Sequence, residues 1–208
     1  MILVIAGGPS VNDYPRGEVE ALARRCFTLA VNETGFVFPC DAIVSIDPWI
    51  ISRKWQTLKE MGKPLITRGW KFKENQHLDL MQLPGDEPYD RQVINRFPLS
   101  GMLACKIADR LALKFGGKAY VLGMDASTGH FTGHPSPDNK TRYVDAALPL
   151  SKYDALDLTR TYNLSVGSLI EAWPKVVNLP IVAEVPDKAE MMSWLRANIK
   201  DEIFKGIV

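Results

Sequence analysis

The chain begins with a run of apolar residues that ends in a Gly-Gly-Pro-Ser turn. Residues 2–6 read Ile-Leu-Val-Ile-Ala, and the turn follows as Gly7, Gly8, Pro9 and Ser10. Two glycines let the backbone approach a ligand closely, and Ser10 offers a hydroxyl and an N–H group. Such a turn suits an anion such as a phosphate, but it also occurs as an ordinary strand-to-helix connection. The glycine spacing of a dinucleotide-binding turn and the Gly-Lys-Ser/Thr ending of a P-loop are both missing.

A second stretch with chemical potential holds two of the three histidines. It reads Gly-His-Phe-Thr-Gly-His over residues 129–134 and lies in a polar segment with prolines, residues 124–142. Long segments without regular periodicity inside a domain are usually functional, so we predict an active-site loop or lid here. An imidazole titrates near about pH 6.5, which suits His134 to general-base catalysis, with His130 as a second catalytic candidate. Zinc binding by this pair is the weakest interpretation, because the glycine and proline beside His134 disfavour a helix that would align both rings.

Polar residues also follow the later apolar runs. Asn32 follows residues 27–31, Asp47 follows residues 41–46, and Asp125 closes the turn after residues 118–122. If these runs are parallel strands, their carboxyl ends share one edge of the sheet, where ligands bind in such folds. The Gly-Gly-Pro-Ser turn and these three side chains would then line a common rim. Asp125 is therefore a third catalytic candidate.

Ser100 stands at the start of the strongest helical pattern in the chain. The helix is predicted to begin near residue 98 and to end at Gly116-Gly117, with an apolar stripe between. Ser100 is a natural N-cap, and the helix start with Gly101 would form a second anion site if it faces the same rim. A cap without any ligand is the alternative. Arg96 and Arg142 add cations that could hold a phosphate by charge-assisted hydrogen bonds.

The remaining patterns complete an α/β domain. Further helices are predicted over residues 17–25, 49–61, 144–161 and 187–205, and further strands near residues 64–67, 78–83 and 162–164. Short apolar runs separated by helical segments are typical of a doubly wound, mainly parallel sheet with helices on both faces. We therefore predict a single Rossmann-like, nucleotide-binding domain over residues 1–208. Asp187 and Glu190 form a capping-box-like start for the C-terminal helix.

Composition narrows the range of partners. The 25 basic and 24 acidic residues give a formal net charge of +1, so nothing in the total favours general attraction to nucleic acid or acidic membranes. No apolar run approaches the roughly 20 residues that span a bilayer, and we expect a cytoplasmic protein. Cys26, Cys40 and Cys105 lack metal or disulfide spacing and are expected to be free, buried thiols. A homo-oligomer remains open.

The ordered motifs together resemble a known group of enzymes. Gly-Gly-Pro-Ser, Val-Asn-Glu, Ile-Asp-Pro, Leu-Ser-Gly-Met, Gly-Met-Asp, His-Phe-Thr-Gly-His and Asn-Leu-Ser-Val-Gly-Ser follow one another as in the bacterial lipooligosaccharide sialyltransferases. The series is similar also to a wider Rossmann-like group, which includes archaeal 6-hydroxymethylpterin diphosphokinases and flagellin-modifying motility accessory factors. The likeness spans residues 2–182 as motif order rather than continuous identity.

The resemblance implies a glycosyltransferase-like enzyme that uses a nucleotide-sugar donor, such as a cytidine monophosphate sugar, without a metal or further cofactor. It assigns donor binding to Gly8, Pro9, Ser10 and Asn32, nucleotide binding to Ser100 and Gly101, and the general base to His134. Gly7 and Asp47 occupy positions in the same motifs, while Arg96 and Arg142 are candidates for holding the leaving phosphate. The acceptor stays open between a sugar, a small metabolite and a modified nucleic acid.

Two other functions remain open at this stage. Asp47, Asp125 and Asp138 offer oxygen ligands suited to Mg²⁺. A diphosphokinase acting on a pterin-like small molecule would need such carboxylates to converge on the nucleotide phosphates. A non-catalytic nucleotide-binding protein would need neither the base nor the metal.

Overall fold

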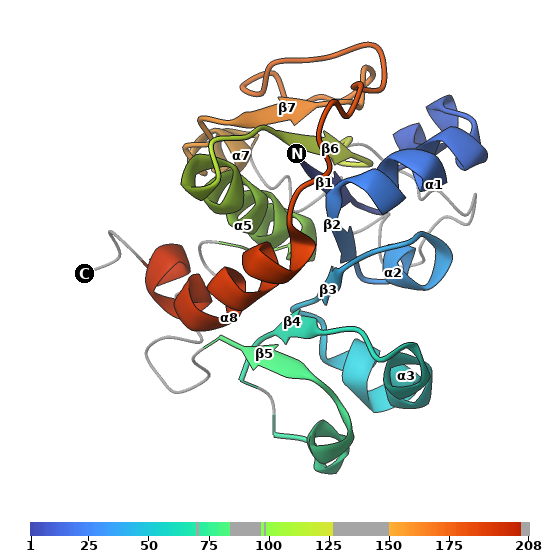
Figure 1. Cartoon of the computed structure of the whole chain (residues 1–208), viewed down its shortest axis with the longest axis vertical. Coiled ribbons are helices and arrows are strands. Elements are labelled where there is room, and N and C mark those ends of the chain that lie inside the picture. The colour runs from blue at the N-terminus through green and yellow to red at the C-terminus, as the bar shows by residue number, and fades with distance from the viewer. Residues whose placement is uncertain (70, 84–96, 98, 127–149, 205–208) are drawn as a thin grey trace.

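In the part of the chain that the structure describes, seven parallel strands form one sheet (Figure 1). This computed structural model describes residues 1–69, 71–83, 97, 99–126 and 150–204. In spatial order the strands are β5 (Leu80–Gln82), β4 (Leu65–Thr67), β3 (Ala42–Val44), β2 (Phe27–Val31), β1 (Ile2–Ile5), β6 (Ala119–Leu122) and β7 (Thr161–Asn163). Every neighbouring pair runs in parallel. The predicted α/β class with a parallel sheet is confirmed.

Helices cover both faces of this sheet, as predicted (Figure 1). The helices α5 (Ser100–Lys114) and α8 (Lys188–Phe204) lie on one face, and α1 (Arg16–Arg25), α2 (Thr34–Val37) and α3 (Pro48–Met61) lie on the other. Shorter helical turns are η1 (Pro9–Asp13), η2 (Lys73–His77) and α7 (Ser151–Asp154). The central strands are buried on both sides, which explains why their sequences are apolar without alternation.

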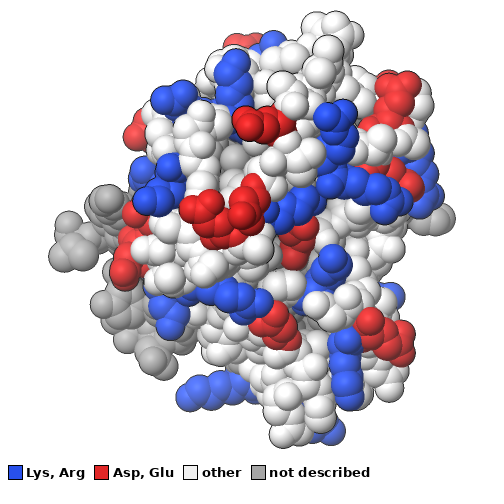
Figure 2. All heavy atoms as spheres, viewed as in Figure 1, with Lys and Arg blue, Asp and Glu red and all other residues white. Residues whose placement is uncertain are grey.

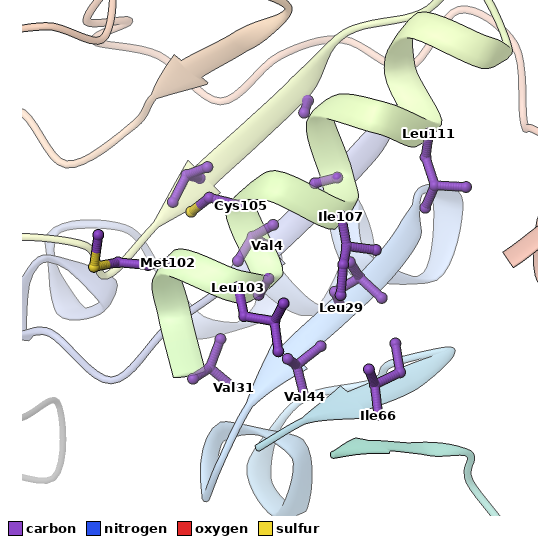
Figure 3. Packing of buried hydrophobic residues seen from close by; sticks show 14 of the residues in the cluster. Val4, Leu29, Val31, Val44, Ile66, Met102, Leu103, Cys105, Ile107 and Leu111 are labelled. Carbon is purple, nitrogen blue, oxygen red and sulfur yellow. The ribbon is translucent and has the colours of Figure 1, made fainter. Parts of the chain in front are cut away.

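The main hydrophobic core lies between α5 and the sheet. Side chains alternate between the two faces of a strand, so Val4 and Leu29 point toward α5, whereas Leu3 packs on the side of α1. Figure 3 shows Leu103 and Ile107 of α5 directed at the strand side chains of this core. This packing fixes α5 against the sheet and thereby fixes where the helix begins.

The order of the strands creates a topological switch point between β1 and β6. From β1 the chain steps through β2, β3, β4 and β5 toward one edge, and α5 then carries it back to β6 on the other side of β1. Ile5 pairs with Ala30 of β2 and with Leu122 of β6, so the turns that follow β1 and β6 leave the sheet side by side. Crevices at such points are the usual ligand sites of doubly wound sheets.

The C-terminal helix begins as the sequence predicts. The backbone N–H of Glu190 donates to Asp187 Oδ1 at 2.9 Å, which caps the first turn of α8. Met191, Leu195, Ile199 and Ile203 are buried against the core, so this apolar stripe is an interior face. The structure describes α8 to Phe204, one residue short of the predicted end.

The prediction of a helix over residues 144–161 is wrong for its described part. Only α7 is helical there, and β7 starts at Thr161. The physical reason is that two buried side chains of α5 bind the intervening backbone: Lys106 Nζ donates to the carbonyl of Leu156 at 2.7 Å, and Asp109 Oδ1 accepts the N–H of Arg160 at 2.7 Å. These bonds replace the intrahelical bonds that local propensity would favour.

The three cysteines are free and buried, as predicted. Burial raises the pKa of the Cys26 and Cys40 thiols to about 11 and raises that of Cys105 further. At pH 8 we expect iodoacetamide to alkylate the folded protein more than about 100-fold more slowly than the urea-unfolded chain, because only the thiolate reacts. Mass spectrometry of timed samples measures both rates. Rapid alkylation of any one cysteine in the folded protein would contradict the burial of that thiol.

The surface carries no single dominant charge on the face shown in Figure 2, where acidic and basic side chains are interspersed. This distribution agrees with the formal net charge of +1. Within the described residues, no helix has the length and apolar character needed to cross a bilayer.

Candidate functional site

One polar network joins the ends of β2 and β3 to the start of α5. Asn32 Nδ2 donates to Asp47 Oδ2 at 2.8 Å, and the Ser100 hydroxyl donates to the same oxygen at 3.0 Å. The Ser100 hydroxyl also accepts the backbone N–H of Ile46 at 3.0 Å. The structure therefore brings together Asn32, Asp47 and Ser100, which the sequence placed on one rim.

The role of Ser100 at the helix start differs from the prediction. Ser100 is the first residue of α5, Leu99 occupies the N-cap position, and no side-chain capping bond forms. The hydroxyl of Ser100 is instead directed across to Asp47 and Ile46. The side chain thus ties the helix start to the end of β3 rather than closing its own first turn.

A second polar network surrounds the Gly-Gly-Pro-Ser turn after β1. The backbone N–H of Ser10 donates to Asp125 Oδ2 at 3.0 Å, and the Ser10 hydroxyl donates to Ser165 Oγ at 2.7 Å. Ser165 Oγ also accepts the N–H of Gly123 at 2.9 Å. The sequence suggested that the Ser10 N–H could donate to a bound phosphate. In this structure it donates to the carboxylate of Asp125 instead.

The turns after β1 and β6 pack directly against each other. The N–H of Gly8 donates to the carbonyl of Gly123 at 2.8 Å, and a Cβ atom at position 8 would lie 2.5 Å from that carbonyl and overlap the Asp125 carboxylate. Gly123 has φ +81°, and a Cβ there would overlap the backbone of Ala6. Packing of the two turns therefore requires glycine at both positions.

The start of α5 lies over the same switch point. A Cβ atom at Gly101 would overlap the Met124 sulfur and would lie 3.9 Å from Ala6 Cβ, so the helix backbone sits directly against the turns after β1 and β6. The positive end of the α5 dipole is consequently directed at the carboxyl edge of the sheet. Gly101 is the residue whose missing side chain permits this close approach.

Among the residues that the structure describes, some buried polar atoms at this edge have no hydrogen-bond partner. They are Asn32 Oδ1, Asp125 Oδ1 and Asn163 Nδ2. Asn32 also adopts a left-handed backbone conformation with φ +52°, a region that asparagine tolerates better than most non-glycine residues. Buried polar groups are nearly always paired, so these atoms are positions where a ligand or water would find partners.

Two side chains at this edge were not assigned a role from the sequence. Ser165 links the turns after β1 and β6. It belongs to the Asn-Leu-Ser-Val-Gly-Ser motif, in which no single residue had been assigned a role. Arg68 directly follows β4 and is 8% exposed, which places a cation near the same edge. Arg68 directly follows the strand predicted near residues 64–67, and this position could have identified it as a candidate site residue.

Several predicted site residues lie outside the described residues. They are Arg96, His130, His134, Arg142 and Asp138, together with the predicted lid beyond Ala126. The catalytic and leaving-group roles assigned to them therefore stay predictions. Of the predicted lid, the structure describes Met124 to Ala126, where the backbone carbonyl of Asp125 accepts the N–H of Leu169 at 2.9 Å.

Asp47 and Asp125, the two described carboxylates at the carboxyl edge of the sheet, belong to separate networks. Asp47 follows β3 and Asp125 follows β6, and the order β3-β2-β1-β6 separates those strands by three strand spacings, roughly 14 Å. Among the described residues, no three His, Cys, Asp or Glu side chains are grouped as metal ligands would be. Asp47 and Asp125 alone do not form the convergent pair that a shared Mg²⁺ needs.

The fold and this edge define an α/β protein with a parallel sheet and with polar side chains gathered at the carboxyl ends of its strands, the edge at which doubly wound sheets commonly bind ligands. The chain matches no protein-family model, no curated protein and no solved structure.

Proposed function

We propose that the chain is a transferase that binds a nucleotide-sugar donor in the switch-point crevice and transfers the sugar to an acceptor. The donor class follows from the motif resemblance, with a cytidine monophosphate sugar as its first representative. His134 would act as the general base that takes the proton of the acceptor hydroxyl. The leaving nucleotide phosphate would be held without a metal ion.

The observation that carries this proposal is the position of the α5 start. It lies against the turns after both β1 and β6, at the switch point of the sheet. A helix N-terminus offers N–H groups and a positive dipole end to an anion. Because Asp125 occupies the Ser10 N–H, we place the donor phosphate at the α5 start rather than on the Gly-Gly-Pro-Ser turn.

The two polar networks would then have different roles. Asp47 and Asn32 lie beside Ser100 and offer acceptor oxygens, which suits the hydroxyl groups of a nucleotide sugar ring. Asp125 and Ser165 hold the turns after β1 and β6 in place and would shape the crevice wall. The separation of Asp47 from Asp125 favours the metal-independent reaction over the diphosphokinase alternative, which needs converging carboxylates.

Replacing Ser100 by alanine tests donor binding. Ser100→Ala removes the hydroxyl that ties the α5 start to Asp47, so we expect the affinity for the best nucleotide in a thermal-shift panel to fall about tenfold. Ser52→Ala is the matched control, since the Ser52 hydroxyl contacts only the Trp49 carbonyl of its own helix among the described residues. Equal nucleotide affinities for both variants would argue against a site at the α5 start.

A product assay separates the proposed reaction from its alternatives. The protein is incubated with a series of nucleotide sugars, with and without EDTA, and the released nucleotide is identified. Nucleotide release that survives EDTA supports the sugar transferase. A strict Mg²⁺ requirement with AMP release from ATP would contradict the sugar transferase and support the diphosphokinase. Tight nucleotide binding without any turnover would instead support a non-catalytic binding protein.

A further inference from the structure

A cavity of about 400 Å³ lies at the opposite edge of the sheet from Asn32, Asp47 and Ser100. Its rim is formed by Arg24 near the end of α1, Asp41 just before β3, Lys63 between α3 and β4, and Lys188 at the start of α8. Because each of the first three precedes a strand of the parallel sheet, the cavity faces the amino ends of the strands. One strand length, roughly 15 Å, separates it from the crevice.

The charges of the rim do not cancel. Lys188 Nζ pairs with Asp41 Oδ2 at 2.9 Å, and the same carboxylate accepts the N–H of Thr28, so Asp41 is already satisfied. Arg24 and Lys63 then remain as cations over the cavity. The carboxyl ends of α1 and α3 contribute about −0.5 charge each, which leaves the rim net positive by about one unit.

Arg24 is only weakly neutralised by its own helix. It lies 3.6 Å from Glu20 Oε2, and the other oxygen of Glu20 is held at 2.8 Å by Arg16. The Arg24 side chain is 66% exposed, and a shared ion pair of this kind contributes little. The guanidinium can therefore turn toward an anion in the cavity at small cost.

The cavity also has apolar lining groups. They are Phe38, Pro39, Met61 and the buried Cys40 thiol. Burial raises the pKa of the Cys40 thiol to about 11, so this thiol is a neutral, apolar part of the lining.

We propose that this cavity binds a small organic anion, with its apolar part against Phe38 and Met61 and its phosphate or carboxylate between Arg24 and Lys63. An apolar wall with a few convergent charged groups is the usual composition of a small-molecule site. The site is distinct from the crevice and does not depend on the transferase proposal.

Phenyl phosphate is a suitable probe, because it combines a ring with a dianion. In a titration of the full chain followed by ¹H–¹⁵N NMR, we expect shifts of the amide signals of Phe38, Cys40, Asp41 and residues 61–63 with a millimolar dissociation constant. Benzyl alcohol lacks the charge and inorganic phosphate lacks the ring, so each should bind at least about tenfold more weakly. Equal binding of benzyl alcohol, or shifts confined to other regions, would overturn the proposal.

Paired lysine variants separate a specific site from general attraction. Lys63→Met removes a rim cation and should weaken phenyl phosphate binding about tenfold, whereas Lys59→Met removes an exposed lysine of α3 that does not line the cavity. Both variants lose the same charge, and both are checked for an unchanged NMR spectrum elsewhere. A loss of affinity that is the same in both would show nonspecific charge attraction and overturn the site.

Discussion

Replacing Gly123 by alanine is expected to lower the free energy of unfolding by about 3 kcal/mol or more. Gly123 has φ +81°, a conformation that costs an alanine about 1–2 kcal/mol. The new methyl group would also overlap the backbone carbonyl of Ala6 and approach Val11 Cγ2 to 2.8 Å. Overpacking of this kind typically costs about 1–3 kcal/mol, and here the main obstacle is backbone that cannot rotate away. Urea unfolding followed by circular dichroism measures the loss.

Gly116→Ala is the matched control for this experiment. Gly116 has φ +68°, but a Cβ atom there would meet no atom of the described residues within 4 Å. Its replacement should cost only the conformational term, about 1–2 kcal/mol. The difference between the two variants isolates the close packing of the turns after β1 and β6. Equal losses for Gly116→Ala and Gly123→Ala would show that these turns do not pack as the structure describes.

The sheet could be predicted because its strands carry an unusually clear signal. Strands β1 and β2 are buried on both faces, so Ile2–Ile5 is apolar throughout and Phe27–Val31 is apolar except for Thr28. The long helices α3, α5 and α8 followed equally from apolar spacing and from turn residues at their ends. The order of the strands was not predictable in this way, because it depends on where α5 carries the chain.

The errors arose where distant residues decide the local structure. The predicted helix over residues 144–161 gives way to β7 because Lys106 and Asp109 of α5 bind the backbone ahead of that strand. Ser100 has the residue type of an N-cap, yet its hydroxyl serves Asp47 and Ile46 instead. Local propensity is a weak guide when a buried side chain from another element supplies the hydrogen bonds.

The candidate site was predicted as a set of strand ends but not as a set of contacts. Asn32, Asp47 and Ser100 do meet, because parallel strands bring their carboxyl ends to one edge. The inward direction of Asp125 could not be foreseen, since it requires the turn after β6 to lie against Ser10. Residue type alone does not distinguish a carboxylate that faces a ligand from one that holds a turn.

Replacing His134 by alanine is expected to lower the turnover of the proposed sugar transfer about 100-fold to 10,000-fold. A general base contributes a factor of this size, because it removes the proton of the acceptor hydroxyl as that oxygen attacks. Donor affinity, measured by thermal shift, should change less than about threefold, since the proposed donor contacts lie at the α5 start. The split between turnover and binding is the readout that a merely structural histidine would not give.

His77→Ala provides the control, because His77 is an exposed histidine of η2 that stacks on Trp55. Its turnover should equal that of the unchanged protein. Addition of free imidazole should partly restore His134→Ala, since a small base can enter the space left by the side chain, but should not affect His77→Ala. If His134→Ala turns over normally while His130→Ala does not, the base is His130. If both variants turn over normally, the reaction uses neither histidine, and base catalysis from the segment at residues 129–134 is wrong.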